Sequence, residues 1–330
     1  MKELHRAQRV GMTAIACALL MRLFSVNMQE RLFFQLTKPK TIVSSTEQET
    51  GHNVRFSSSI AAFSPDFMES PVPSLPEVKK VPIPSFSGEE NVKLYYAANI
   101  QPDIPQLLAK PLQWDLTGKN PGVLILHTHA TESYSRRGEN YKETSAWRTL
   151  DEGYNMLAIG ELVAGILEKN GISVIHDESL HDYPSYNGSY TRARKTLRQL
   201  LKEYPEVQLV LDLHRDASGE GAGQMRTRAE VAGETSAQLM VVIGTNHEHY
   251  EENLSLGLKL HALLEQQSPG IMRPLQLRGQ RFNQDLSTGA LLIEVGAAGN
   301  SHGEARIAAA QLAEAVVALA KGTVSEENGE

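Results

Sequence analysis

Three apolar runs, each about as long as one buried strand, constrain the fold of this chain more than any other feature. Each run ends at a histidine or a glutamate: Val123–Leu126 precedes His-Thr-His, Val207–Leu213 precedes His214, and Ala290–Ile293 precedes Glu294. Nearly continuous apolar runs are typical of strands that are buried on both faces, as in parallel sheets. Helical patterns lie between them. This alternation predicts an α/β domain with a mixed, mainly parallel sheet flanked by helices.

Two of the helices can be placed by their spacing and their end signals. Apolar residues at helical spacing predict a helix over Tyr154–Lys169, with Asp151 as its cap and Asn170 followed by glycine at its end. A second helix is expected over Thr191–Glu203, where Pro205 closes the unit. A further strand is expected at Ile172–Ile175, between the two helices, so each helix follows a predicted strand.

The strand ends carry the residue types of a catalytic zinc site. In open α/β sheets, ligands bind beyond the carboxyl ends of the strands, so we expect these ends to converge. His129 and Glu132 lie three residues apart, and one short turn can point both at one ion. His214 would be the third ligand. Glu294 is then a spare carboxylate beside the ion, where a catalytic zinc site needs a base.

A structural interpretation of the same residues has to be weighed. A single histidine at a strand end is more often a hydrogen-bonded structural residue than a ligand. A buried, unpaired Glu294 would be costly, however, so a purely structural role explains it poorly. The three strand ends taken together favour the metal site.

Composition limits the partners and the ligand types. The 330 residues suffice for one large domain or two small ones. The net charge of −7 argues against a nucleic-acid partner, which a basic face would indicate. Cys17 is the only cysteine, so an intramolecular disulfide and a cysteine-based zinc site are both excluded. Any zinc must be bound by histidines and carboxylates.

The N-terminal pattern predicts a membrane anchor. Basic residues precede an apolar stretch, as in an export signal or a signal anchor, and no small-x-small cleavage site follows it. Retention as a single-pass anchor is therefore favoured over cleavage. The predicted organisation is a cytoplasmic N-terminus (1–9), a transmembrane signal anchor (10–28), a Pro/Ser-rich extracytoplasmic spacer (41–106), a catalytic domain (113–322) and an acidic tail (323–330).

Several motifs resemble those of the stage II sporulation protein P family of endospore-forming bacteria. They are His127–Tyr134, His181–Tyr190, Asp212–Ala217, Phe282–Ser287 and Leu292–Gly296. The resemblance implies a zinc-dependent N-acetylmuramoyl-L-alanine amidase with endopeptidase activity on peptidoglycan cross-links. It also implies action during engulfment, in the space between mother cell and forespore. The partners that it implies are sporulation protein D, a lytic transglycosylase, and sporulation protein M, a membrane protein.

The resemblance extends to the fold that zinc amidases share with phosphorylases and zinc carboxypeptidases. The chain lacks the Gly-His-Gly turn that those amidases have after the first strand. Asp151 lies about where they place a glutamate ligand, so the second ligand is either Glu132 or Asp151. His127 likewise competes with His129 for the first position.

Our interpretation of the sequence is a membrane-anchored peptidoglycan hydrolase. Glu294 takes a proton from the attacking water and delivers it to the leaving amine. Arg215 orients the substrate or the oxyanion, or forms a salt bridge with Asp216. Two alternatives stay open: a non-catalytic wall-binding module, and a zinc carboxypeptidase in which Arg281 would bind the terminal carboxylate.

Overall fold

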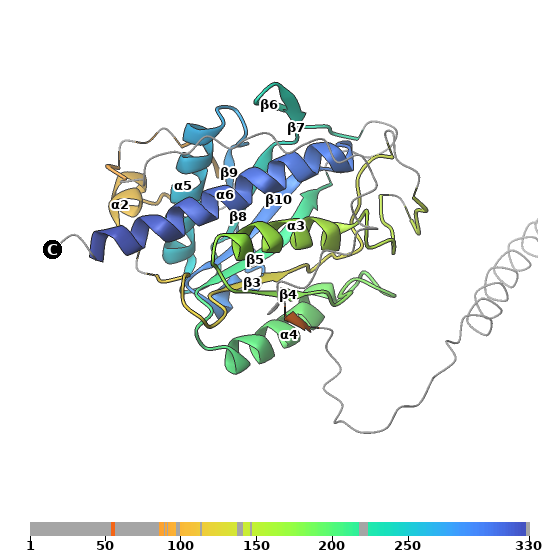
Figure 1. The fold of residues 1–330 in the computed structure, drawn as a ribbon, viewed down its shortest axis with the longest axis horizontal. Coiled ribbons are helices and arrows are strands. Elements are labelled where there is room, and N and C mark those ends of the chain that lie inside the picture. The colour runs from red at the N-terminus through yellow and green to blue at the C-terminus, as the bar shows by residue number, and fades with distance from the viewer. Residues whose placement is uncertain are drawn as a thin grey trace, which may run out of the picture. The chain divides into compact units, whose positions relative to one another are not determined.

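One eight-stranded sheet forms the centre of the domain (Figure 1). The computed structural model describes residues 54–56, 86–88, 90, 92–96, 100–112, 114–136, 141–145, 147–217 and 224–327. The predicted cytoplasmic N-terminus (1–9), the anchor (10–28) and most of the spacer (41–106) lie outside these residues. Within the described part of the chain, none of the helices is both long and apolar enough to span a bilayer.

The sheet is mixed and mainly parallel. Its strand order is β1-β4-β3-β5-β10-β8-β9-β2. The strands are β1 (Val54–Phe56), β2 (Leu94–Tyr96), β3 (Val123–Leu126), β4 (Val174–Asp177), β5 (Leu209–Asp216), β8 (Leu239–Gly244), β9 (Leu275–Arg278) and β10 (Ala290–Ala297). Only the pairs β1–β4 and β10–β8 are antiparallel among these strands. The predicted fold class is therefore confirmed. A separate hairpin pairs β6 (Ala229–Val231) with β7 (Glu234–Ser236).

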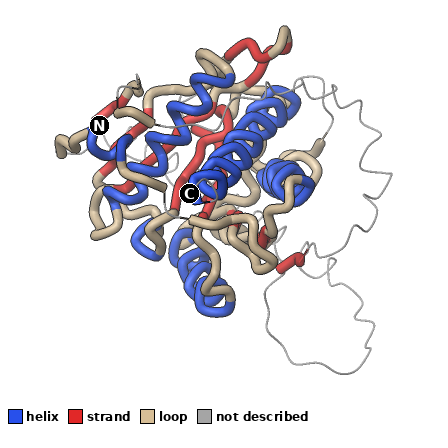
Figure 2. The backbone as a smooth tube through the Cα atoms, turned by 60° about the vertical axis from the view of Figure 1, so that its left-hand side comes forward, coloured by secondary structure: helices blue, strands red, loops and turns tan. Residues whose placement is uncertain are grey.

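Helices cover both faces of the sheet. They are α2 (Ile104–Ala109), α3 (Met156–Lys169), α4 (Ser189–Glu203), α5 (Tyr250–Gln267) and α6 (His302–Glu327), with a 3-10 turn η2 (Gln284–Leu286). The apolar side chains of α3, α5 and α6 pack in one core, and those of α4 pack in a second core on the opposite face. Figure 2 shows the long α6 lying across the strands.

Alternation along β3 supplies both cores. Val123 and Ile125 pack under α3, α5 and α6, whereas Leu124 and Leu126 pack with α4. Successive side chains of a strand point to opposite faces, so a strand between two helical layers must be apolar at every position. All four residues of β3 are buried, which explains the continuous apolar run.

The start of α3 differs from the prediction. The helix begins at Met156, and Asn155 is its N-cap, with the side chain accepting a hydrogen bond from the Leu157 amide at 2.9 Å. Asp151, the predicted cap, instead accepts the amide of Gly153 at 3.2 Å in a turn that precedes the helix. The prediction that Asp151 caps this helix was therefore wrong.

Candidate active site

The ends of β5 and β10 place His214 and Glu294 side by side. The two residues are partners in the register of the parallel ladder. Leu213 and Ile293, one position earlier, belong to the core under α3, α5 and α6. Because side chains alternate along a strand, His214 and Glu294 lie on the other face, the face that α4 covers. Two of the predicted functional residues therefore lie on neighbouring strands, at the same edge of the sheet.

His129 follows the end of β3 and lies against His214. The two ring centroids are 5.2 Å apart, and the rings are nearly perpendicular at 88°. Tyr186 stacks on His129 at 4.6 Å, and Tyr190 lies edge-on at 5.5 Å. Within the described residues, the buried Nδ1 of His129 has no hydrogen-bond partner. Burial lowers the pKa of His129 to about 4, so its ring is neutral, which is the form that binds a metal.

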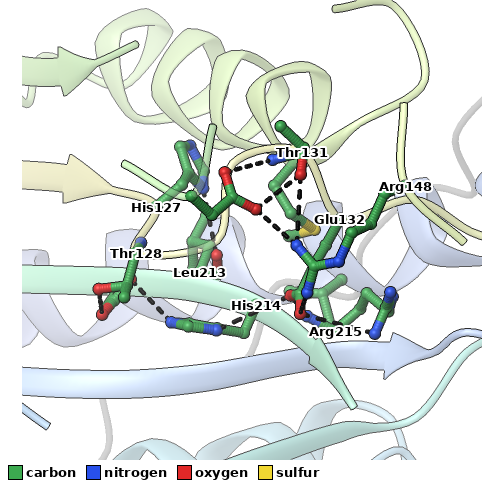
Figure 3. A network of polar contacts seen from close by, with 12 residues as sticks. His127, Thr128, Thr131, Glu132, Arg148, Leu213, His214 and Arg215 are labelled. Carbon is green, nitrogen blue, oxygen red and sulfur yellow. Dashed lines mark hydrogen bonds and ion pairs between the residues drawn. The ribbon is translucent and has the colours of Figure 1, made fainter. Parts of the chain in front are cut away.

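Asp212 supports His214 from two positions earlier on β5. Nε2 of His214 lies 2.9 Å from Oδ1 of Asp212. Asp212 also accepts hydrogen bonds from the amide and the hydroxyl of Thr128, at 2.8 Å and 2.6 Å (Figure 3). Burial opposes a charge on His214, but Asp212 and Glu132 outweigh it and raise the pKa of His214 to about 9. A carboxylate behind a histidine is a common support for a metal ligand.

Glu132 is held by two arginines as well as by His214. Its Oε1 lies 3.4 Å from Nη2 of Arg148 and 3.6 Å from Nη1 of Arg215. Its Oε2 accepts the Arg215 amide at 3.2 Å and lies 3.8 Å from Nδ1 of His214 (Figure 3). Burial acts to raise the pKa of Glu132, but Arg215 and His214 hold it below the usual value. The carboxylate is therefore ionised, as a metal ligand must be.

His129, His214 and Glu132 are the candidate ligands for a metal ion. Among the described residues, no three His, Cys, Asp or Glu side chains are already arranged to hold one. In Glu132, Oε1 faces the two arginine side chains, whereas Oε2 lies beside His214. The donor set nevertheless fits zinc: His129 and His214 adjoin each other beside a carboxylate, and His129 has a buried nitrogen without a partner.

Glu294 is suited to moving a proton. Its Oε2 is buried and has no hydrogen-bond partner among the described residues. Burial raises the pKa of Glu294 to about 8, against the opposing effect of His214 and with a smaller contribution from Glu132 in the same direction. A carboxyl group with a pKa near neutrality can both accept and release a proton at physiological pH.

His127 lies on the opposite face of the sheet, beneath α3. Its Nε2 is 2.9 Å from Nε2 of His176, and its Nδ1 is 3.2 Å from the carbonyl oxygen of Leu213. The helix comes this close because Gly160 has no side chain: a Cβ there would lie 2.4 Å from both Nε2 atoms. His127 thus contacts the main chain just before His214, not the group formed by His129 and Glu132.

Asp151 and Arg215 were also predicted near the site. Asp151 is exposed, and in the described structure it contacts none of the candidate ligands. Arg215 is buried, contacts Glu132, and donates to two carbonyl groups of the segment after β3. The alternative salt bridge from Arg215 to Asp216 was wrong, because Asp216 pairs with Arg273 at 2.7 Å. Consecutive strand residues point to opposite faces, which separates the two side chains.

Five residues of the site were missed as individual contributors. They are Asp212, Arg148, Asp182, Tyr186 and Tyr190. Arg148 bridges the site, since it contacts Glu132, pairs with Asp182 at 2.6 Å, and lies over the ring of Tyr186 at 4.7 Å. Asp212 could have been found from its position two residues before His214, which places both on one strand face. The other four depend on how loops fold back.

The family was then determined by comparison with known proteins. A family model described as Stage II sporulation protein P (SpoIIP) matches residues 41–317. The chain belongs to the stage II sporulation protein P family. A relative of that name from Bacillus subtilis (strain 168) is 29% identical over 204 residues, which cover 58% of this chain and 49% of the relative. The match therefore spans about half of the length of that family member.

Solved structures of similar fold were also found. The N-acetylmuramoyl-L-alanine amidase AmiC2 of Nostoc punctiforme has a TM-score of 0.36 and 14% identity, covering 64% of this chain and 99% of its own. The CwlD amidase from Clostridioides difficile, solved in complex with the GerS lipoprotein, has a TM-score of 0.39 and 14% identity, covering 62% and 99%.

Proposed function

We propose that this chain is a zinc-dependent peptidoglycan hydrolase that cleaves the amide bond between N-acetylmuramic acid and L-alanine. The observation that carries the proposal is the grouping of His129, His214 and Glu294 at one edge of the sheet, in a member of the stage II sporulation protein P family. Hydrolysis at zinc requires metal ligands and a separate proton acceptor. Here two imidazoles that can bind the metal in their neutral form and one carboxylate would be the ligands.

Each residue has a distinct role in this mechanism. His129, Glu132 and His214 would hold the zinc ion, which when bound acts as a Lewis acid on the scissile carbonyl group. Asp212 fixes the ring of His214 so that Nδ1 faces Glu132. Glu294 accepts a proton from the attacking water and then delivers it to the nitrogen of the leaving L-alanine.

The remaining parts of the proposal come from the sequence and the family resemblance. Endopeptidase activity on peptide cross-links, action in engulfment, and partnership with sporulation proteins D and M belong here. So does the organisation into an anchor (10–28), an extracytoplasmic spacer (41–106) and a catalytic domain (113–322). This organisation would hold the enzyme at the membrane, facing the wall between mother cell and forespore.

Mass analysis of fragments released from purified cell wall tests the proposed reaction. An amidase exposes the amino group of L-alanine and leaves N-acetylmuramic acid without a peptide. A zinc carboxypeptidase would instead release single C-terminal residues, and a wall-binding module would release nothing. His214→Ala should abolish zinc binding and turnover together. Full activity of wild-type protein after removal of its metal would refute the zinc mechanism.

A further inference from the structure

A cavity of about 420 Å³ adjoins the candidate active site. Its lining consists of Tyr190, Arg194, Gln280, Arg281, Phe282 and Asn283. The ring of Tyr190 adjoins both the cavity lining and the two histidines. Its centroid lies 6.0 Å from that of Phe282 on the cavity side, and 5.5 Å and 6.4 Å from those of His129 and His214. The cavity and the candidate active site therefore share one wall.

The loop that forms the far wall is held in a strained conformation. Phe282 and Asn283 are consecutive residues with φ values of 51° and 58°, in the left-handed region that side chains disfavour. Such strain persists only where the surroundings enforce it, and it is concentrated at functional sites. Asn283 donates to the carbonyl of Tyr190 at 3.0 Å. Gln284 bonds to Gly244 and Val242 of β8, at 2.7 Å and 2.8 Å. The loop is thus fixed to both α4 and the sheet.

The two arginines at the cavity differ in how they are paired. Arg194 makes a two-pronged contact with Asp285, with distances of 2.7 Å and 2.6 Å, so these two charges cancel. Arg281 is exposed and, within the described residues, forms no salt bridge, although its charge also acts on Asp285 and helps to lower the pKa of that carboxyl. Its planar guanidinium matches a carboxylate in geometry and in charge. Tyr190 and Phe282 add aromatic surface to the lining of the same cavity.

We infer that this cavity is the subsite for the acidic peptide part of the substrate, and that Arg281 binds one of its carboxylates. The inference rests on the proposed function, since it names what lies beside the scissile amide. The volume is within the range of small-ligand pockets, which are mostly apolar and carry a few polar groups that fix orientation. Binding here would place the peptide against Tyr190, which adjoins both histidines.

The test compares two substrates in the full-length, zinc-loaded protein. One is a synthetic muramyl peptide with free carboxylates, and the other is the same compound with these carboxylates converted to primary amides. Wild-type protein should cleave the free acid with the higher kcat/KM. Arg281→Gln should lower kcat/KM for the free acid by about tenfold, the factor expected for one charge-assisted hydrogen bond, and leave the amide unaffected. Arg198→Gln removes an exposed arginine of α4 that does not line the cavity, and should change neither value.

A binding measurement separates this inference from the proposed function. The free peptide, without the sugar, is titrated calorimetrically into wild-type protein and the Arg281→Gln variant. Turnover of both muramyl peptides at equal rates, or equal loss on both in Arg281→Gln, overturns the subsite and leaves the amidase standing. Carboxylate-dependent peptide binding that Arg281→Gln removes, in a protein that cleaves neither compound, supports the subsite and refutes the proposed reaction. Absence of both turnover and carboxylate-dependent binding overturns both.

Discussion

Asp212→Asn tests whether the carboxylate behind His214 prepares it as a ligand. The carboxylate makes three contacts: with the amide and the hydroxyl of Thr128 at 2.8 Å and 2.6 Å, and with Nε2 of His214 at 2.9 Å. Asparagine has nearly the same shape but keeps one acceptor oxygen and no charge. The variant therefore removes the charge from all three contacts, and we expect it to lower the free energy of unfolding by about 2–4 kcal/mol.

Zinc affinity should fall further than general destabilisation explains. Loss of the group that orients a metal-binding histidine typically reduces affinity by about 10–100-fold. The affinity is measured by competition with a chromophoric chelator, and stability by urea unfolding of the metal-free protein. Unchanged zinc affinity in Asp212→Asn would refute the proposed support of His214.

Asp182→Asn is the matched control. Asp182 is another buried carboxylate with three contacts, two from Thr131 at 3.2 Å and 2.6 Å and one from Arg148 at 2.6 Å. In the described structure it contacts neither His129 nor His214, and it is linked to Glu132 only through Arg148. The control should lose stability by a similar amount and lose much less zinc affinity. Equal losses of zinc affinity in the two variants would mean that the effect is not specific to His214.

Three further predictions concern ligands, packing and pH. His129→Ala and Glu132→Ala should each lose most of the bound zinc, whereas Asp151→Ala should retain it. Zinc content is measured by elemental analysis, and loss of zinc from Asp151→Ala would contradict the assignment. Gly160→Ala places a methyl carbon 2.4 Å from two buried imidazole nitrogens, so urea unfolding should show a loss of about 1–3 kcal/mol, and no loss would contradict the tight packing. In the folded protein, the pKa of Glu294 is raised from 4.5 to about 8. Protonated Glu294 therefore stabilises the metal-free protein fully below pH 4.5, and this stabilisation is lost as the pH rises through about 8. Glu294→Gln should lack this fall in unfolding measurements across that pH range, and an unaltered fall would refute its origin in Glu294.

The sheet could be predicted because its signal is local. A strand between two helical layers must be apolar at every position, and this leaves continuous runs in the sequence. The ends of the strands do not follow from the apolar runs alone, because polar residues can extend a ladder. β5 continues to Asp216, three residues beyond the predicted end at Leu213, because the pairing of His214 with Glu294 continues the parallel ladder past the apolar part. The N-cap of α3 is Asn155 and not the predicted Asp151, because Asp151 begins a turn that precedes the helix.

The site could be predicted only where it lies on strand ends. His214 and Glu294 are adjacent because parallel strands end at one edge, which the sequence pattern indicates. The contacts of Arg148, Tyr186 and Tyr190 depend on the paths of loops between distant segments. No local period encodes such paths. The ionisation of His214 and Glu294 depends in turn on those contacts and on burial, so neither pKa follows from the sequence.

The Glu294→Gln variant, measured for zinc content and for cell-wall turnover in one preparation, tests the proposed zinc-dependent hydrolysis most directly. Glutamine keeps the shape of the side chain but cannot accept the proton. We predict about one zinc ion per chain in both wild type and variant. The release of N-acetylmuramic acid without its peptide should fall by at least about 10²-fold in the variant, the usual scale of general acid–base catalysis. Undiminished turnover, or loss of the zinc together with the activity, would contradict the role assigned to Glu294.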